Sequence, residues 1–364
     1  MDSTYNTSGY YSASYKEAKE RFLQAAVDLN AQIYTYHPET LAQPDLTIDV
    51  AIIGDRSKPV LVVSSGVHGV EGFFGSAVQL AWLEGMRRKG VDKNICTIFI
   101  HAVNPFGFAN IRRVNEENVD LNRNFLPDNQ CYRGAPDSYE DLNGFLNPEV
   151  PPGNMDLFFV KVATNILKHG GLQSLKNAVA RGQYEFPKGI FYGGAAACDS
   201  TNIIKENCSL WLGETKKVVH IDLHTGLGQS GDYKILLAEP EKSPNKKWYK
   251  KIFGKKKVEF LASGKGTAYK ASGIMGEWLQ HYFQHVDYRF AAAEFGTYPV
   301  LKMLKVIRRE NSFFHFGDRS SDAYKKAVED LKECFFPASF EWRRKSLHSG
   351  LEVINQAVKA LKHL

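Results

Sequence analysis

The pattern of apolar and polar positions divides the first hundred residues into alternating helix-like and strand-like segments. Residues 14–32 repeat apolar positions at helical spacing, which predicts an amphipathic helix. Strands are predicted at 33–38, 46–54, 58–66 and 94–105. The third of these, KPVLVVSSG, is a continuous apolar run, as in strands that are buried on both faces. A helix is predicted at 71–89, between two such strands, and this order is typical of a parallel α/β sheet.

The rest of the chain continues the same pattern after one long interruption. Pro, Gly, Asn and Asp dominate residues 126–153, which predicts a long loop or an inserted segment. Helices are expected near Lys161 and Leu175. Sheet-like runs return at 216–226, 232–239 and 289–297, and helical patterns follow at 300–310, 322–333 and 339–362.

These elements predict one α/β domain that covers residues 1–364. We expect a phosphorylase/hydrolase-like domain with a central mixed, mostly parallel sheet flanked by helices. An insertion is expected at about 126–213, and a helical C-terminal part from about residue 300. No internal repeat or low-complexity linker suggests a second domain.

Composition narrows the class of protein without naming a function. The 364 residues are 43% hydrophobic and 24% charged, as in ordinary soluble globular proteins. No apolar run approaches the roughly 18 residues of a membrane helix, and the polar opening MDSTYNTSGYYSASYK lacks the pattern of a signal peptide. We therefore expect a cytoplasmic protein that does not bind membranes. Five scattered cysteines without C-x-x-C spacing predict reduced thiols, with no disulfide framework and no thiolate zinc site.

Charge gives little support for a nucleic-acid-binding function. The formal net charge is +6, a small excess for this length, so we expect no nucleic-acid partner. Seven lysines fall within residues 246–257 with aromatic residues between them, a pattern that is compatible with phosphate binding. We favour the simpler interpretation, a solvated helix and loop with the aromatic side chains packed beneath it.

Residues with metal-binding chemistry follow two of the buried strands. The third predicted strand runs into GVHGVEGFFG, so His68 and Glu71 lie just past its carboxyl end, where α/β sheets place their sites. Alone, this pair is weakly specific, because surface turns carry such pairs by chance. His224, in HIDLHTGLG, leaves a second strand and supplies the third ligand of a two-histidine, one-carboxylate metal site. We leave Asp222 and His220 of that strand out of the ligand set.

An acidic residue, Glu294, ends the otherwise apolar strand RFAAAEFGT. Burying a carboxylate is costly, so a carboxylate in such a strand is expected to be paired, protonated or functional. A general base beside a metal-bound water satisfies these conditions, and we predict this role for Glu294.

A further group of polar residues lies in the loop that follows the strand at 94–105. This loop, NPFGFANIRRVNEENVDLNRNF, contains Arg112, Arg113, Asn122 and Arg123. An adjacent Asn and Arg can bind a carboxylate through bidentate guanidinium contacts and an amide donor. Loop arginines are usually solvated, but this loop leaves the edge of the sheet where the metal ligands are expected.

The order of these residues resembles that of a known superfamily. The site residues resemble those of the zinc carboxypeptidases (peptidase family M14-like) and of their aspartoacylase and succinylglutamate desuccinylase relatives. The residues that follow the family's order along the chain are His68, Glu71, Asn122, Arg123, His224 and Glu294. The stretch TAYKASG, with Tyr269 ahead of Glu294, is similar to the carboxypeptidase segment that carries a mobile substrate-binding tyrosine. The closest resemblance is to the bacterial domain of unknown function 2817 family (DUF2817), with which FYGG at Phe191 and HTGLG at His224 agree. The ordered motifs span roughly residues 46–297.

The resemblance implies a role for each matching residue. One Zn²⁺ per chain would be bound by His68, Glu71 and His224. Its water would be deprotonated by Glu294. The scissile carbonyl would be polarised by Arg113, with Arg112 as the alternative for this role or as a further substrate-binding residue. The free carboxylate of the substrate would be held by Asn122, Arg123 and Tyr269.

Two features depart from a minimal carboxypeptidase. Arg123 and His224 lie 101 positions apart, a longer separation than a minimal enzyme needs, so a lid or rim over the site is expected within this span. Gly276 stands where the specificity pocket is expected, and it offers neither charge nor bulk. The preferred substrate side chain therefore does not follow from the sequence.

We interpret the sequence as a zinc-dependent hydrolase that cleaves an amide bond adjacent to a free carboxylate, foremost a metallocarboxypeptidase acting on peptides. The first alternative is an N-acyl amino acid deacylase with the same machinery, which Gly226 after Thr225 favours. The second is a non-catalytic carboxylate-binding protein of the same fold. The expected partner is a small peptide or an N-acyl amino acid with a free carboxylate.

Overall fold

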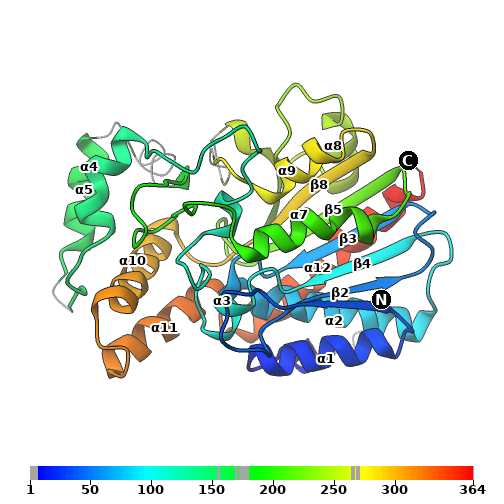
Figure 1. Ribbon diagram of the computed structural model, residues 1–364, viewed down its shortest axis with the longest axis horizontal. Coiled ribbons are helices and arrows are strands. Elements are labelled where there is room, and N and C mark those ends of the chain that lie inside the picture. Colours follow the sequence, from blue (N-terminus) through cyan, green and yellow to red (C-terminus); the bar gives the residue numbers. More distant parts are fainter. Residues whose placement is uncertain are drawn as a thin grey trace.

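The predicted strands assemble into one mixed sheet (Figure 1). The computed structural model describes residues 7–153, 156–168, 171, 180–263, 267 and 271–363. Within these residues the sheet has eight strands, in the order β1-β2-β4-β3-β5-β8-β6-β7. The strands are β1 (Gln32–Tyr36), β2 (Ile48–Ile53), β3 (Val60–Ser65), β4 (Cys96–His101), β5 (Lys217–Gly226), β6 (Tyr233–Leu237), β7 (Val258–Phe260) and β8 (Asp287–Gly296). All but the three-residue β7 are predicted from the sequence.

The directions of the strands confirm the predicted sheet type. β4, β3, β5 and β8 run parallel in the centre of the sheet. β2 and β6 run antiparallel to the central strands beside them, β1 is antiparallel to β2, and β7 is parallel to β6. The carboxyl ends of the four central strands therefore meet at one edge, where open α/β sheets bind their ligands.

Helices cover both faces of this sheet (Figure 1). On β3, Leu61 and Val63 pack with the face covered by α1, α2 and α12, whereas Val60 and Val62 pack with the face covered by α7 and α9. β3 is buried along its whole length, as its continuous apolar run predicts. The helices are α1 (Tyr15–Val27), α2 (Gly72–Lys89), α3 (Pro105–Ala109), α4 (Asp137–Leu146), α5 (Phe158–Lys168), α7 (Asp199–Leu212), α8 (Lys246–Phe253), α9 (Met275–Tyr282), α10 (Val300–Phe316), α11 (Asp322–Phe335) and α12 (Phe340–Leu361).

The first helix is shorter than the predicted 14–32 because the chain turns after Val27. Ser14 caps the helix by accepting a hydrogen bond from the N–H of Glu17. Asn30 has a left-handed backbone (φ 53°), a conformation that a right-handed helix does not contain. The chain then enters β1 at Gln32.

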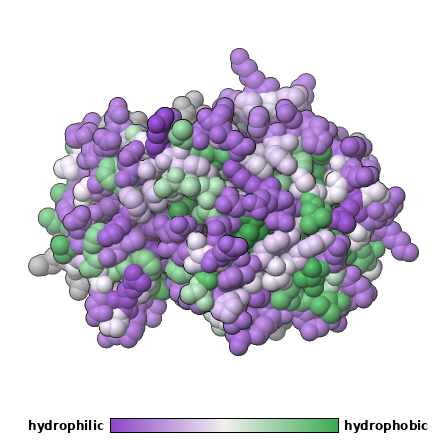
Figure 2. Space-filling model, viewed as in Figure 1, coloured by the Kyte–Doolittle hydropathy of each residue, from purple (hydrophilic) through white to green (hydrophobic). Residues whose placement is uncertain are grey.

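The span predicted as an insertion, residues 126–213, contains helices of two kinds. α4 and α5 stand beside α10, away from the sheet (Figure 1). α7 instead packs on the sheet, with Ile204 and Trp211 in the hydrophobic core. Apolar side chains also gather on the surface over α5, at the left of Figure 2, where Phe159 and Val160 are 58% exposed. The helix expected near Leu175 lies outside the described residues.

The last helices and the lysine-rich segment agree with their predictions. α10, α11 and α12 occupy the predicted helical regions, and α10 continues to Phe316. The first four lysines of the run lie in α8, which buries Tyr249 and Phe253, and the last three follow it. Four of the seven lysines are exposed and none is buried, as the simpler interpretation expects. Across the described residues, no helix combines the length and the apolar character needed to cross a membrane.

Candidate metal centre

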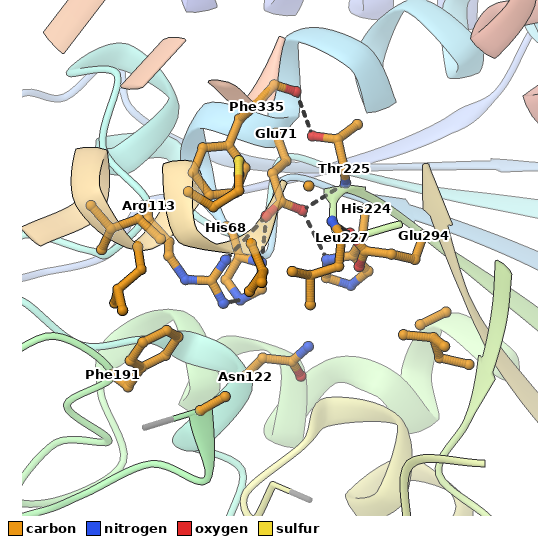
Figure 3. A pocket seen from close by; sticks show the side chains of 18 of the residues that line it. His68, Glu71, Arg113, Asn122, Phe191, His224, Thr225, Leu227, Glu294 and Phe335 are labelled. Carbon is orange, nitrogen blue, oxygen red and sulfur yellow. Dashed lines mark hydrogen bonds and ion pairs between the residues drawn. The ribbon is translucent and has the colours of Figure 1, made fainter. Parts of the chain in front are cut away.

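The three predicted metal ligands converge at the carboxyl edge of the parallel strands (Figure 3). His68 follows β3, Glu71 lies in the 3₁₀ helix η2 (Gly69–Glu71) that leads into α2, and His224 lies near the end of β5. The candidate ligand atoms of the three lie within 4.8 Å of one another, and all three side chains are buried. Among the described residues, this is the one group of His, Cys, Asp or Glu side chains with such geometry.

A close backbone contact positions the turn that carries Glu71. A Cβ at Gly69 would lie 2.0 Å from the carbonyl carbon of Gly107 in α3, so only glycine allows this approach. The N–H of Gly69 also donates to the carbonyl of Arg113 at 3.1 Å. The segment after β4 and the turn after β3 are therefore docked backbone to backbone.

Each histidine is oriented by a carboxylate on the far side of its ring. His68 Nε2 lies 3.1 Å from Asp120 Oδ1 and 2.8 Å from Arg113 Nη2, and His224 Nε2 lies 2.6 Å from Asp222 Oδ2. Both Nδ1 atoms face Glu71, at 2.8 Å for His68 and 3.0 Å for His224. At His224, a carboxylate that accepts the Nε2 proton leaves the Nδ1 lone pair for a cation. The donor set therefore fits a divalent metal held by two imidazoles and Glu71, as in catalytic zinc sites.

The charges around the three residues favour positive charge at this site, carried by a bound cation or by the protonated His224. Burial opposes ionisation of Glu71, but His68 and His224 hold the pKa of this carboxyl below its usual range. Burial likewise opposes ionisation of Asp120, and the nearby Arg113, Arg123 and His68 charges hold its pKa well below the usual value. Ionised carboxylates thus surround both histidines.

The predicted base, Glu294, lies beside His224 because the two residues pair in the parallel register of β5 and β8. Side chains at paired positions point to the same face of a sheet. Glu294 Oε1 accepts a hydrogen bond from the N–H of Leu227 at 2.8 Å. Burial, together with the Glu71 carboxylate, raises the pKa of Glu294 to about 7. This carboxyl can therefore exchange a proton near neutral pH, as a general base must.

The two adjacent arginines of the predicted site point in different directions. Arg113 lines the cavity, with Nη1 3.2 Å from Glu71 Oε1 and Nη2 3.1 Å from Asp120 Oδ2. Arg112 does not line it: its fully buried side chain forms an ion pair with Glu310 of α10 at 2.7 Å. The substrate-binding role predicted for Arg112 is corrected accordingly, because this side chain connects the loop to α10.

Two of the three predicted carboxylate-binding residues also line the cavity, on the 3₁₀ helix η3 (Leu121–Arg123). The N–H of Met275 donates to Asn122 Oδ1 at 3.0 Å, and Figure 3 shows the amide nitrogen of Asn122 directed toward the histidines. Arg123 is buried, and its Nε and Nη2 donate to the carbonyl of Ala180 at 3.0 and 2.6 Å. The third predicted residue, Tyr269, lies outside the described residues.

Sequence reasoning missed a buried hydrogen-bonded chain behind His224. Asp222 Oδ1 accepts from Ser64 Oγ at 2.6 Å, Ser64 Oγ lies 2.7 Å from His220 Nε2, and His220 Nδ1 lies 2.8 Å from Tyr288 Oη. All of these side chains are on the same face of β3, β5 and β8. The polar residues at every second position of HIDLH were the signal for this chain, since such positions share one face of a strand.

The cavity also has apolar lining residues, and these differ from the position, Gly276, at which the sequence predicted the specificity pocket. Gly276 does not line the described cavity, because it is buried in α9 with no room for a Cβ. Ile274 and Ala292 line the cavity instead. From the span predicted to form a lid or rim, Ala180 and Phe191 reach the cavity.

Solved structures of carboxypeptidases are among those that align with this chain. Bovine thrombin-activatable fibrinolysis inhibitor, solved with tick carboxypeptidase inhibitor, aligns over 97% of this chain and 98% of its own, at 13% identity and a TM-score of 0.53. For carboxypeptidase A from Helicoverpa armigera the coverage is 88% and 73%, at 15% identity and a TM-score of 0.44. For a metallo-carboxypeptidase from Burkholderia cenocepacia it is 95% and 68%, at 10% identity and a TM-score of 0.48. The first alignment shows a carboxypeptidase-like α/β fold.

Sequence comparison gives the family. No curated protein matches the chain in sequence. The profile of the family described as "Protein of unknown function (DUF2817)" matches residues 11–349, which is most of the chain. This match confirms the predicted resemblance, and the chain belongs to the DUF2817 family.

Proposed function

We propose that the protein is a zinc-dependent hydrolase that cleaves an amide bond adjacent to a free carboxylate, as a metallocarboxypeptidase does. The observation that carries this proposal is the convergence of His68, Glu71 and His224 within 4.8 Å, with Glu294 beside them on the neighbouring strand. A structural ion-pair network also buries such groups, but here the three ligands and Glu294 all line one cavity.

The side chains around the cavity divide the work of amide hydrolysis. His68, Glu71 and His224 would hold a zinc ion, which would supply a Lewis acid for the carbonyl and for a water molecule. Glu294 accepts a proton from the attacking water and returns it to the leaving amine nitrogen. Arg113 donates N–H groups to the carbonyl oxygen as negative charge develops there.

Asn122 and Arg123 bind the free carboxylate of the substrate in this proposal. Asn122 is fixed through Met275, which leaves the amide nitrogen as its donor toward the cavity. The Arg123 guanidinium is held by the backbone carbonyls of Ala180 and Asn122, which are neutral acceptors. A carboxylate is a stronger acceptor than a carbonyl, so the substrate competes effectively for these N–H groups.

The variant Glu294→Gln tests the proposal. It is expected to bind about one zinc ion per chain, like the natural protein, and to lose activity by about 10³-fold or more, because the proton acceptor is gone. Zinc content is measured by elemental analysis, and turnover is measured with C-terminally free dipeptides and N-acyl amino acids.

The control is the double variant His68→Ala/His224→Ala, which is expected to lose both metal and activity. Near-normal turnover by Glu294→Gln would exclude Glu294 as the base, and full metal occupancy in the double variant would exclude this metal site. The relative rates on dipeptides and acyl amino acids distinguish a carboxypeptidase from a deacylase.

A further inference from the structure

The cavity that contains the proposed site has two apolar walls built from different elements. One, the sheet wall, consists of Leu236, Leu261, Ile274 and Ala292. The other, the helix wall, consists of Val300, Leu301, Met303, Leu304 and Ile307 of α10 with Phe335 of α11. Within the described part of the chain, the acidic and basic side chains that line the cavity belong to neither wall; they are Glu71, Arg113, Arg123 and Glu294.

The sheet wall flanks the residues that bind the carboxylate in the proposed function. The N–H of Met275 holds Asn122 Oδ1, so the adjacent Ile274 is fixed beside the Asn122 amide. Ala292 lies on the same face of β8 as the proposed base, and its partner across the sheet is Leu236 of β6. A substrate residue whose carboxylate contacts Asn122 therefore places its side chain against the sheet wall.

The helix wall lies near Arg113, the residue that contacts the scissile carbonyl in the proposed function. The Arg113 guanidinium carbon is 5.5 Å from the centre of the Phe191 ring and 5.9 Å from that of Phe335. Figure 3 shows both aromatic side chains on the Arg113 side of the histidines and Glu294 on the other side. Phe335 packs in one cluster with Met303 and Ile307 of the helix wall. The acyl part of the substrate therefore meets this wall.

We propose that the substrates are apolar on both sides of the scissile amide. The residue with the free carboxylate carries an apolar side chain, and the acyl or aminoacyl group on the other side is also apolar. This inference rests on the proposed function and names its substrate class. An acidic group that packs against either wall would lose its hydration to apolar side chains, and the nearest guanidinium, that of Arg113, is already paired with Glu71 and Asp120, so acidic substrates are disfavoured.

Four substrates in a two-by-two design test this inference on the natural, zinc-loaded protein: N-hexanoyl-leucine, N-hexanoyl-aspartate, N-succinyl-leucine and N-succinyl-aspartate. We expect the highest kcat/KM for N-hexanoyl-leucine. Each acidic replacement is expected to lower kcat/KM by about 100-fold or more, because a buried carboxylate without a partner is strongly unfavourable. A parallel pair of peptides, acetyl-Phe-Leu and acetyl-Glu-Leu, is expected to show the same order.

Binding provides a second measurement that does not depend on turnover. The four compounds are titrated into the zinc-loaded Glu294→Gln variant by calorimetry, and the same order of affinity is expected. Equal or better cleavage and binding of either acidic compound would overturn the inference while leaving the hydrolase intact. If none of the compounds is cleaved, the proposed function fails, and the order of affinities still decides the inference.

Two variants test which wall contacts which part of the substrate. Ile274→Lys is expected to improve the kcat/KM for N-hexanoyl-aspartate relative to N-hexanoyl-leucine by at least 10-fold, and Met303→Lys to do so for N-succinyl-leucine. Each variant is a control for the other, because its wall contacts only one part of the substrate. If Ile274→Lys instead improved cleavage of N-succinyl-leucine, and Met303→Lys that of N-hexanoyl-aspartate, the assignment of the two walls would be wrong.

Discussion

At the scale of single residues, the orientation of His224 depends on the buried chain behind it. Asp222 is held by Ser64 and contacts His224 Nε2 at 2.6 Å. Replacing a carboxylate that orients a metal-binding histidine typically lowers metal affinity by about 10- to 100-fold. We expect this loss for Asp222→Asn, measured by zinc competition with a chromophoric chelator. Tyr288→Phe, at the far end of the chain, is the control and is expected to keep its affinity; equal affinities in both variants would contradict this account.

A second residue, His101, makes the stability of the fold dependent on pH. Its side chain is fully buried against Phe22, and burial lowers its pKa to about 3. Both ring nitrogens lack a hydrogen-bond partner among the described residues. The unfolded chain binds a proton at this histidine below about pH 6.5, whereas the folded protein does not. The folded state therefore loses about 1.4 kcal/mol of stability per pH unit as the pH falls from about 6.5 toward 3.

The variant His101→Phe is expected to remove this loss. Between pH 7 and pH 4.5, its free energy of unfolding should fall by about 2–3 kcal/mol less than that of the natural protein. Urea unfolding at the two pH values measures the difference, and His348→Gln, at an exposed position, is the control. A fall as steep as in the natural protein would show that His101 does not titrate in this range.

Single residues also differ in how far the sequence predicts their roles. The metal-ligand prediction required only that three side chains leave neighbouring parallel strands, and topology then brings them together. The choice between Arg112 and Arg113 depends on which way a loop backbone turns, and no periodicity records this. Asp120 was overlooked because its partner, His68, lies on another segment of the chain.

At the scale of elements, the contact between η2 and α3 sets the position of Glu71. Gly69→Ala would place a Cβ 2.0 Å from the backbone of Gly107, so η2 would have to move. We expect a loss of roughly 2–4 kcal/mol of stability, comparable to severe overpacking, and weaker zinc binding. Thermal unfolding and zinc titration measure these two effects.

The matched control for this prediction is Gly85→Ala within α2. A Cβ there would meet no atom within 4 Å, so this change is expected to stabilise the helix by about 0.5–1 kcal/mol. Similar stabilities for the two variants would show that η2 tolerates displacement.

Elements differ in how well the sequence predicts them. Long buried strands and helices have strong periodic signals, and most of these elements were predicted close to their observed bounds, although α1 ends five residues before its predicted end. β7 has three residues, Val258–Phe260, which is too short for an alternating pattern to be distinguished from a loop. α7 was assigned to an insertion because its moderate apolar pattern follows a loop-rich segment, although Trp211 places it in the core.

At the scale of the whole molecule, a bound metal is expected to stabilise the entire domain. The proposed ligands come from two segments that are far apart in the sequence, and the unfolded chain does not bring them together. At a free zinc concentration about 1,000-fold above Kd, binding adds about 4 kcal/mol of stability, so chelation should lower Tm by several degrees. Differential scanning calorimetry measures the shift. In His68→Ala/His224→Ala, the same chelator is expected to leave Tm unchanged, and an equal shift there would indicate binding elsewhere.

The pairing of His224 with Glu294 has a consequence for how this scaffold can be re-engineered. Neighbouring strands are about 4.8 Å apart, so the spacing of this pair is a property of the backbone ladder. If β8 slipped by one residue, the Glu294 side chain would point to the opposite face of the sheet. No side-chain repacking could then bring this carboxyl back beside His224. Directed-evolution libraries for new substrates therefore belong on α10 and on the segment around Phe191, where diversity leaves the reactive geometry untouched.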